Sequence, residues 1–327
     1  MTQTNRATSW PIGLRLFNRP EYAQQLISSL KKQTLEIHDH QLHVIIDGYA
    51  GSLDEQRGRP NKTTQVASLI RESFPEADIE LCGLNLGIAE TTYRLQTKVF
   101  DRVEAHWAIF LEEDIVLDPQ YLEALHHMID LSEDVAEVVK VAANQINLAY
   151  LNLPPKSDRR HFYLGQGTQA FAERRKFFEG RKHLTEIYLK EISGRQYSDR
   201  DESEVFATLA EHGVFTTMGN NDVVHDRITM AQKALHIVTP QRLLIDVGVA
   251  GETSFAYPDI PLPDSATARV LETTKDDLLR AVVHLKEEAH SFEHKFFKDF
   301  WAGYLVSFSG RLAASVLLKK FTKAFKR

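Results

Sequence analysis

Residues 107–125 read WAIFLEEDIVLDPQYLEAL, a stretch in which an apolar run meets three consecutive acids. The run Trp107–Leu111 predicts a buried strand, and Glu112, Glu113 and Asp114 follow directly at its carboxyl end. In open α/β sheets, ligands bind outside the carboxyl ends of the strands. The three acids are therefore the first candidates for a binding or catalytic site.

The rest of the first half repeats this alternation of short apolar strands and amphipathic helices. The pattern predicts strands over 12–17, 43–46, 79–82 and 107–111, and helices over 21–32, 62–74, 91–103 and 120–129. Such spacing is typical of right-handed crossovers and a mostly parallel sheet. The expected fold class is α/β, with a Rossmann-like nucleotide-binding sheet flanked by helices. In the less regular second half we expect a strand over 139–147, a charged helix over 173–189 and helical structure from 274 onwards.

The composition of the 327 residues, 43% hydrophobic and 26% charged, is that of a globular protein with a sizeable core. A net charge of −6 argues against a general nucleic-acid binder. The single cysteine, Cys82, excludes an internal disulfide and a multi-cysteine metal site. Because the N-terminal sequence lacks the apolar run of a signal peptide, we expect a cytoplasmic protein.

The acid triplet raises a question of charge. Three adjacent carboxylates repel one another, and either a divalent cation or a set of hydrogen-bond donors would relieve that repulsion. Mg²⁺ or Mn²⁺ is usually held by one or two carboxylates together with substrate phosphates. The alternative is that two of the acids are exposed and one caps the following turn. A zinc site is not expected, because no histidine or cysteine is adjacent.

Two further loops are candidates for contacts with a nucleotide. Asp47 follows the strand 43–46, where an aspartate can accept hydrogen bonds from a ribose hydroxyl; the alternative is an ordinary turn aspartate before a glycine. The loop 83–89, GLNLGIA, precedes a helix and can bring backbone amides close to a phosphate or a sugar. It matches neither the Walker P-loop nor GxGxxG, which disfavours an ATPase or a dehydrogenase.

Taken in order, four fragments resemble the GT-A glycosyltransferases: NRPEY at 18–22, IIDG at 45–48, LNLGIAE at 84–90 and FLEEDIVLDPQYLEAL at 110–125. The sequence is most similar to the inverting group that includes bacterial family-two-like enzymes and the N-acetylglucosaminyltransferase-I type. The resemblance covers about 10–130 and, more loosely, 160–255. It implies a catalytic domain over 1–273, with a nucleotide-sugar half at about 10–130 and an acceptor half at about 131–273. A helical, basic amphipathic extension would follow over 274–327.

The resemblance also implies a role for particular residues on the donor side. Asn18, Arg19 and Pro20 would border the base, Asp47 would contact uridine or ribose, Asn85 and Gly87 would lie near the donor, and Arg94 would face the diphosphate. Asp114 matches the ligand of a Mn²⁺ or Mg²⁺ ion. Beside it, Glu113 matches the residue that contacts ribose, within a triplet completed by Glu112. This chain reads EED where relatives read EDD.

For the acceptor side, the resemblance matches Asp222 to the catalytic base. Asn221 stands where relatives have tryptophan, Asp246 stands where they have asparagine, and the stretch 251–254, GETS, lacks the histidine that relatives have there. Asp222 can also be the N-cap of a helix beginning near Val223. Neighbouring candidates for the base are His225 and Asp226.

The implied activity is a metal-dependent, inverting transfer of a hexosyl or N-acetylhexosaminyl group from a nucleoside-diphosphate sugar, UDP-linked by expectation. The acceptor would be a glycan or lipid-linked molecule in cell-envelope polysaccharide synthesis. Such a transfer needs one base and a stabilised leaving group, whereas glycoside hydrolysis needs a flanking pair of carboxyl groups. Two alternatives remain: a non-catalytic nucleotide- or sugar-binding module of the same fold, and a nucleotidyltransferase.

The last 28 residues, 300–327, hold six basic side chains and no acid. Apolar positions there fall on one helical face, while Arg311 in the middle argues against a membrane-spanning helix. A basic amphipathic helix on an anionic membrane surface is one interpretation, which would make the protein peripheral on the inner face of the membrane. The other is a helix packed on the domain.

Overall fold

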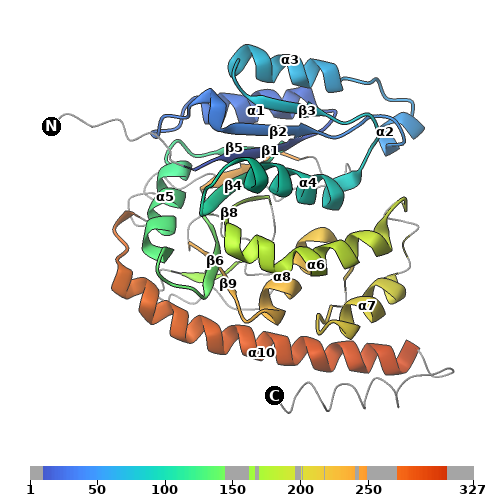
Figure 1. Cartoon of the computed structure of the whole chain (residues 1–327), viewed down its shortest axis with the longest axis vertical. Helices are drawn as coiled ribbons and strands as arrows, with labels where there is room; N and C mark the ends of the chain where they lie inside the picture. Colours follow the sequence, from blue (N-terminus) through green and yellow to red (C-terminus); the bar gives the residue numbers. More distant parts are fainter. Residues whose placement is uncertain are drawn as a thin grey trace.

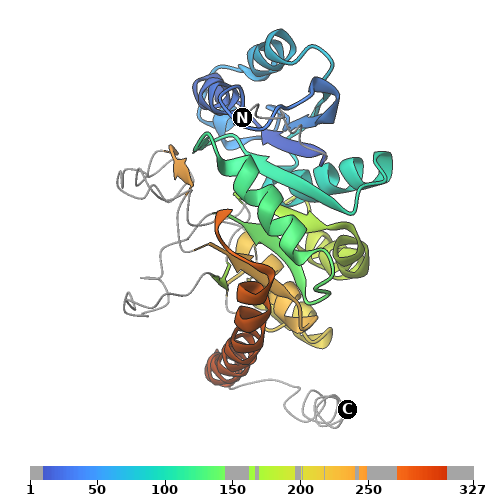
Figure 2. The same cartoon turned by 90° about the vertical axis from the view of Figure 1, so that its left-hand side faces the viewer.

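The computed structural model describes residues 10–143, 162–165, 169–195, 200, 202–216, 218–239, 243–248 and 271–307. These residues form an eight-stranded mixed sheet with helices on both faces (Figure 1, and turned by 90° in Figure 2). The expected α/β class, with a mostly parallel sheet flanked by helices, is confirmed.

The main sheet comprises β1 (Ile12–Leu16), β2 (Leu42–Ile46), β3 (Asp78–Leu81), β4 (Trp107–Glu112), β6 (Val138–Ala142), β7 (Tyr163–Leu164), β8 (Ala170–Arg174) and β9 (Leu235–Val238). A second, two-stranded sheet joins β5 (Ile115–Leu117) to β10 (Leu244–Asp246). The helices are α1 (Pro20–Leu30), α2 (Leu53–Gln56), α3 (Thr63–Ser73), α4 (Gly87–Arg102), α5 (Tyr121–Ser132), α6 (Arg175–Ile192), α7 (Glu202–Glu211), α8 (Asn221–Ala231) and α10 (Lys275–Ser307).

The strand order β3-β2-β1-β4-β8-β6-β9-β7 places the turning point of the topology between β1 and β4. From β1 the chain moves outward through β2 to β3, and it then returns across α4 to add β4 on the other side of β1. β8 and β7 run antiparallel to their neighbours, whereas all other pairings in the sheet are parallel. Ligands of open α/β sheets bind at such a switch point, outside the carboxyl ends of the strands.

The strand β4 is buried on both faces, which explains why its sequence is a continuous apolar run. Trp107, Ile109 and Leu111 belong to the core that also contains side chains of α1, α3 and α5. Ala108 and Phe110 belong to the core on the opposite face, beneath α4 and α6. The carboxyl end of β4 is therefore held from both sides, and the acids that follow it are placed on a rigid support.

The start expected for the charged helix over 173–189 is wrong. Glu173, expected to start a charged helix over 173–189, lies instead in β8, opposite Ala108 of β4. Pairing with β4 fixes this segment as a strand, and both carboxylate oxygens of Glu173 accept hydrogen bonds of 2.9 Å from the buried Arg181 of α6. The helix begins only at Arg175. Pairing with a strand that is distant in the sequence thus overrides a locally helical pattern.

A row of charged and polar side chains is buried beneath α6 and α8. Lys140 on β6 lies between Glu173 and His236 in the register of the sheet, and its Nζ is 3.9 Å from Glu173 Oε1. His225 of α8 is fully buried near this row, and neither of its ring nitrogens has a hydrogen-bond partner among the described residues. Burial, and then the positive charges of Arg181 and Lys140, hold the pKa of His225 well below its ordinary value.

The neutral state of His225 predicts a loss of stability in acid. At neutral pH the folded and unfolded chains both carry this imidazole uncharged. Below about pH 6.5 only the unfolded chain takes up the proton, so the free energy of unfolding falls by about 1.4 kcal/mol per pH unit for such a group. Urea denaturation of His225→Leu at pH 7.5 and 5.5 should therefore show a smaller acid loss than wild type. The exposed His284 supplies the control, since His284→Gln should keep the full loss; an unchanged loss in His225→Leu would contradict this interpretation.

The helix α10 runs along the edge of the molecule beside β9 and α8 (Figure 1). Its buried residues Leu278, Val282 and Leu285 pack into the main core. Residues 300–307 continue this helix, while residues 308–327, which hold all six basic side chains of the segment 300–327, lie outside the described residues. Within the described part of the chain, no helix has both the length and the apolar character needed to cross a membrane.

Candidate active site

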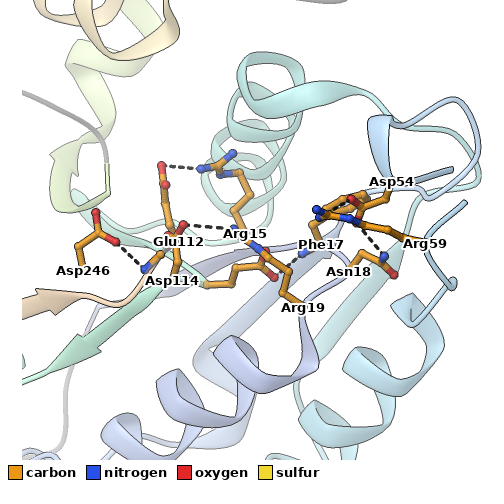
Figure 3. Close-up of polar contacts among 11 residues, drawn as sticks. Arg15, Phe17, Asn18, Arg19, Asp54, Arg59, Glu112, Asp114 and Asp246 are labelled. Carbon is orange, nitrogen blue, oxygen red and sulfur yellow. Dashed lines mark hydrogen bonds and ion pairs between the residues drawn. The ribbon is translucent and has the colours of Figure 1, made fainter. Parts of the chain in front are cut away.

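The candidate site lies at the carboxyl ends of β1 and β4, where the strand order reverses. Arg15 of β1 and Glu112 of β4 are direct neighbours in the sheet. The residues that follow each strand converge there, and Figure 3 shows the arginines of the first segment turned toward the acids of the second. The acid triplet expected at a strand end is thus found at the switch point itself.

Each acid of the triplet has a cationic partner from the β1 segment. Arg15 Nη2 is 2.5 Å from Glu112 Oε1, and Arg19 Nε donates to Glu113 Oε1 at 2.5 Å. Arg19 Nη2 lies 3.2 Å from Asp114 Oδ2 (Figure 3), and the backbone amide of Phe17 donates to Glu113 Oε2 at 2.7 Å. The repulsion within the triplet is therefore relieved by a set of donors, one of the two solutions expected from the sequence.

The triplet carries perturbed ionisation. Burial raises the pKa of Glu112 to about 8, with Asp114 and Asp222 adding to the rise and Arg15 opposing it. Burial likewise raises the pKa of Glu113, against the influence of Arg19 and the Phe17 amide. Perturbed pKa values of this kind are typical of catalytic and ligand-binding sites.

Asp114 retains one oxygen for a ligand. Its Oδ1 is buried and has no hydrogen-bond partner among the described residues, while Oδ2 faces Arg19. No group of three histidine, cysteine, aspartate or glutamate side chains suited to a metal ion occurs in the part of the chain that the structure describes. The single open carboxylate oxygen fits a divalent cation that is shared between one carboxylate and phosphate oxygens of a ligand.

Asn18 is occupied by its own loop. Its Nδ2 donates to Asp54 Oδ2 at 2.9 Å and to the carbonyl of Pro60 at 3.1 Å, and its Oδ1 accepts from the Lys62 amide at 2.6 Å. Asp54 is further paired with Arg59 (Figure 3). Asn18 thus fastens the segment around α2 to the end of β1. Beside it, Pro20 is the first residue of α1, where its fixed φ suits the helix.

Asp47 anchors the start of α4. Oδ1 accepts from the amides of Gly48 and Leu86 at 2.8 Å each, and Oδ2 accepts from Asn85 Nδ2 and the Gly87 amide at 3.0 Å each. These bonds explain why α4 begins at Gly87, four residues before the expected start at 91. Gly48 is required here, because a Cβ would lie 2.2 Å from the Leu84 backbone. The residues predicted to contact the donor, Asp47, Asn85 and Gly87, are brought together, but by bonds to one another.

Replacing Asp47 with alanine should destabilise the fold. The change leaves the amides of Leu86 and Gly87 without their acceptor, and hydrogen bonds to a charged group are worth about 1.5–3 kcal/mol each. We expect the free energy of unfolding in urea to fall by about 2–4 kcal/mol. Asp101→Ala, at an exposed position of α4, is the matched control and should change stability little. If Asp47→Ala is as stable as wild type, the loop before α4 does not depend on the hydrogen bonds to Asp47.

Arg94 forms an ion pair with an acid outside the triplet. Its Nη2 is 2.5 Å from Glu80 Oε1 of β3, and its side chain is 51% exposed. The resemblance implied that Arg94 faces a diphosphate. Its ion pair with Glu80 does not support that role.

Asp222 lies in the first turn of α8, near the triplet. It is close enough to Glu112 to raise the pKa of that side chain, and its charge also acts on Lys140. The N-cap of the helix is Asn220, whose Oδ1 accepts from the Val223 amide at 2.9 Å. Asp222 is therefore not the N-cap of this helix, which was the alternative to a role as base. Its side chain is partly exposed. The other candidates for the base, His225 and Asp226, are buried, at 0% and 5% exposure.

Sequence reasoning missed Arg15 and Gln169. The signal for Arg15 was a single charged residue within the apolar strand IGLRLF. Gln169 connects the two sheets, because its carbonyl accepts from the Glu112 amide and its Nε2 donates to Asp246 Oδ2 at 2.9 Å. No local pattern marks it. The segment 249–270, which includes Gly251, lies outside the described residues.

No protein-family model matches this sequence, and no curated protein matches it. Among solved structures, the chain is similar to S. aureus TarS 1-349 in complex with UDP-GlcNAc, at 12% identity and a TM-score of 0.45, over 76% of this chain and 62% of that one. A second crystal structure of S. aureus TarS gives 12% identity and a TM-score of 0.43, over 67% of this chain and 41% of that one. The chain thus spans less than two thirds of either TarS chain. At such identities, its function must be argued from its own site.

Proposed function

We propose that this chain is an inverting GT-A glycosyltransferase that moves a sugar from a nucleoside-diphosphate donor, with UDP as the favoured nucleotide, to a glycan or lipid-linked acceptor. The observation that carries the proposal is the position of Asp114. Its buried, unpartnered Oδ1 lies at the topological switch point, where Arg19 contacts its other oxygen and Arg15 contacts the nearby Glu112. A divalent cation and guanidinium groups both bind diphosphate oxygens and stabilise their negative charge.

The donor side supplies charge for the leaving group. Asp114 would hold Mn²⁺ or Mg²⁺ jointly with the diphosphate, and such a cation stabilises the negative charge that develops as the nucleotide departs. Arg15 and Arg19 present planar guanidinium groups at the same strand ends and can bind phosphate oxygens in a bidentate manner. The loops fastened by Asn18 and Asp47 would form the walls for the nucleoside.

The acceptor side would be formed by α8. Inversion requires a base that removes the proton of the acceptor hydroxyl from the face opposite the leaving group. Asp222 approaches the triplet from a different element, α8, and it is the partly exposed acid of this turn. We assign it the role of general base. The hexosyl or N-acetylhexosaminyl class of the donor and the role in cell-envelope polysaccharide synthesis are part of the same proposal.

A panel of substrates tests the proposal against its alternatives. The purified chain with Mn²⁺ is incubated with UDP-GlcNAc, UDP-glucose and GDP-mannose, and separately with nucleoside triphosphates and sugar 1-phosphates. Release of a nucleoside diphosphate supports the proposal, whereas release of pyrophosphate identifies a nucleotidyltransferase. Saturable nucleotide-sugar binding without any product, across a panel of glycan and lipid-linked acceptors, would identify a binding module.

Membrane contact through residues 300–327 is a separate proposal, supported by six basic side chains without an acid. Each basic residue near an anionic surface contributes about 1 kcal/mol. Deleting 300–327 should therefore weaken binding to phosphatidylglycerol vesicles by at least about tenfold, while turnover of a soluble acceptor stays largely unchanged. Equal vesicle binding by the truncated and full-length chains would show that the segment is only structural.

A further inference from the structure

Arg19 occupies the two acids that a divalent cation would approach. Its guanidinium contacts Glu113 Oε1 at 2.5 Å and Asp114 Oδ2 at 3.2 Å (Figure 3). It also lies over the ring of Tyr22, at 4.9 Å from the ring centroid. The side chain of Arg19 is 25% exposed, whereas those of Glu113 and Asp114 are 3% and 8% exposed. The arginine thus covers the acids from the solvent side.

In this arrangement, the Arg19 guanidinium and a divalent cation bound to Asp114 would repel each other. A cation on the remaining oxygen of Asp114 would lie next to a guanidinium that already neutralises the other oxygen. With a single carboxylate oxygen open and a cation beside it, the bare site binds a divalent ion poorly. A nucleoside diphosphate changes this balance, because its oxygens accept hydrogen bonds from a guanidinium as well as ligating the ion.

We propose that Arg19 is a charge latch: it neutralises Glu113 and Asp114 in the empty site, excludes a divalent cation that arrives alone, and transfers its hydrogen bonds to the diphosphate when cation and nucleotide bind together. This inference rests on the proposed function, since it requires a diphosphate ligand. By linkage, the nucleotide must raise the affinity for the cation by the same factor as the cation raises the affinity for the nucleotide.

The latch predicts effects of opposite sign for one substitution. In Arg19→Gln, Mn²⁺ alone, followed by the electron paramagnetic resonance signal of the free ion, should bind about tenfold more tightly than to wild type. UDP, titrated calorimetrically in the presence of Mn²⁺, should bind about tenfold more weakly. A merely structural role would weaken both. Arg19→Lys keeps the charge without the planar fork, and should change both affinities in the same directions by less.

Arg280→Gln, which removes a remote and 71% exposed arginine, is the matched control for net charge and should leave both affinities unchanged. If Arg19→Gln does not fold, Arg19→Lys carries the test. Unchanged or weaker Mn²⁺ binding in the folded variant overturns the latch, even where UDP binds wild type normally and the proposed function stands. If wild type binds no nucleotide, the proposed function fails; the Mn²⁺ titration still shows whether Arg19 opposes the ion.

Discussion

Asp114→Ala is expected to abolish the metal-dependent part of nucleoside-diphosphate binding while the chain stays folded. Asp114 carries the buried oxygen that fits a divalent ion, and no second group of ligands is present among the described residues. A metal ion contributes several kcal/mol of charge stabilisation, so we expect the affinity for UDP in Mn²⁺ to fall by roughly 100-fold or more. Calorimetric titration with UDP, with and without Mn²⁺, measures this directly.

Folding of this variant needs its own check, because Asp114 also contacts Arg19. Arg19 keeps its shorter bond to Glu113 in the variant, so circular dichroism and the midpoint of urea unfolding should stay near those of wild type. Asp276→Asn, at an exposed position of α10, controls for the loss of one acid. Unchanged UDP affinity in Mn²⁺ would remove Asp114 from the site.

Asp222→Asn is expected to lower turnover by roughly a hundred- to ten-thousand-fold, the range that a positioned general base contributes. Asparagine keeps the size of the side chain and much of its hydrogen bonding but cannot accept the proton. Donor affinity should hardly change, because the groups proposed to bind the donor do not belong to α8. Arg15 and Arg19 belong to the β1 segment, and Asp114 follows β4. Single-turnover rates and donor titrations on the same preparation separate the two quantities.

Two other outcomes have clear meanings. A loss of donor affinity as large as the loss of rate would show that Asp222 organises the site instead of accepting a proton. Full activity in Asp222→Asn would move the base elsewhere. His225 is a poor substitute, since it is fully buried, and Asp226 lies 3.8 Å from His236 inside the protein.

The apolar run Trp107–Leu111 shows what the sequence can reveal. A run without alternation predicts a strand buried on both faces, and the acids behind it must then emerge at the carboxyl end of the sheet. The structure confirms this placement. Local patterning suffices here because burial and strand geometry are both encoded within a few residues.

The partners of the acids could not be predicted in the same way. Arg19 contacts Glu113, 94 residues further along the chain, and Asn18 joins the segment at Asp54 through a bond that no local pattern indicates. The local pattern predicts a helix at Glu173, but pairing with Ala108 of β4 makes this segment a strand, and periodicity does not encode such a non-local pairing. The sequence thus indicates which residues emerge near the site, while the fold decides whether each faces a ligand or its own loop.

The most direct test of a glycosyltransferase is the balance of products from one donor. UDP-GlcNAc, UDP-glucose and GDP-mannose are each incubated with the chain, Mn²⁺ and a mixture of glycan and lipid-linked acceptors, and nucleoside diphosphate and glycosylated product are quantified together. We predict equal amounts of the two from at least one donor with wild type, and neither with Asp114→Ala. Intact donor in every wild-type reaction, or equal turnover by Asp114→Ala, would contradict a metal-assisted transfer at this site.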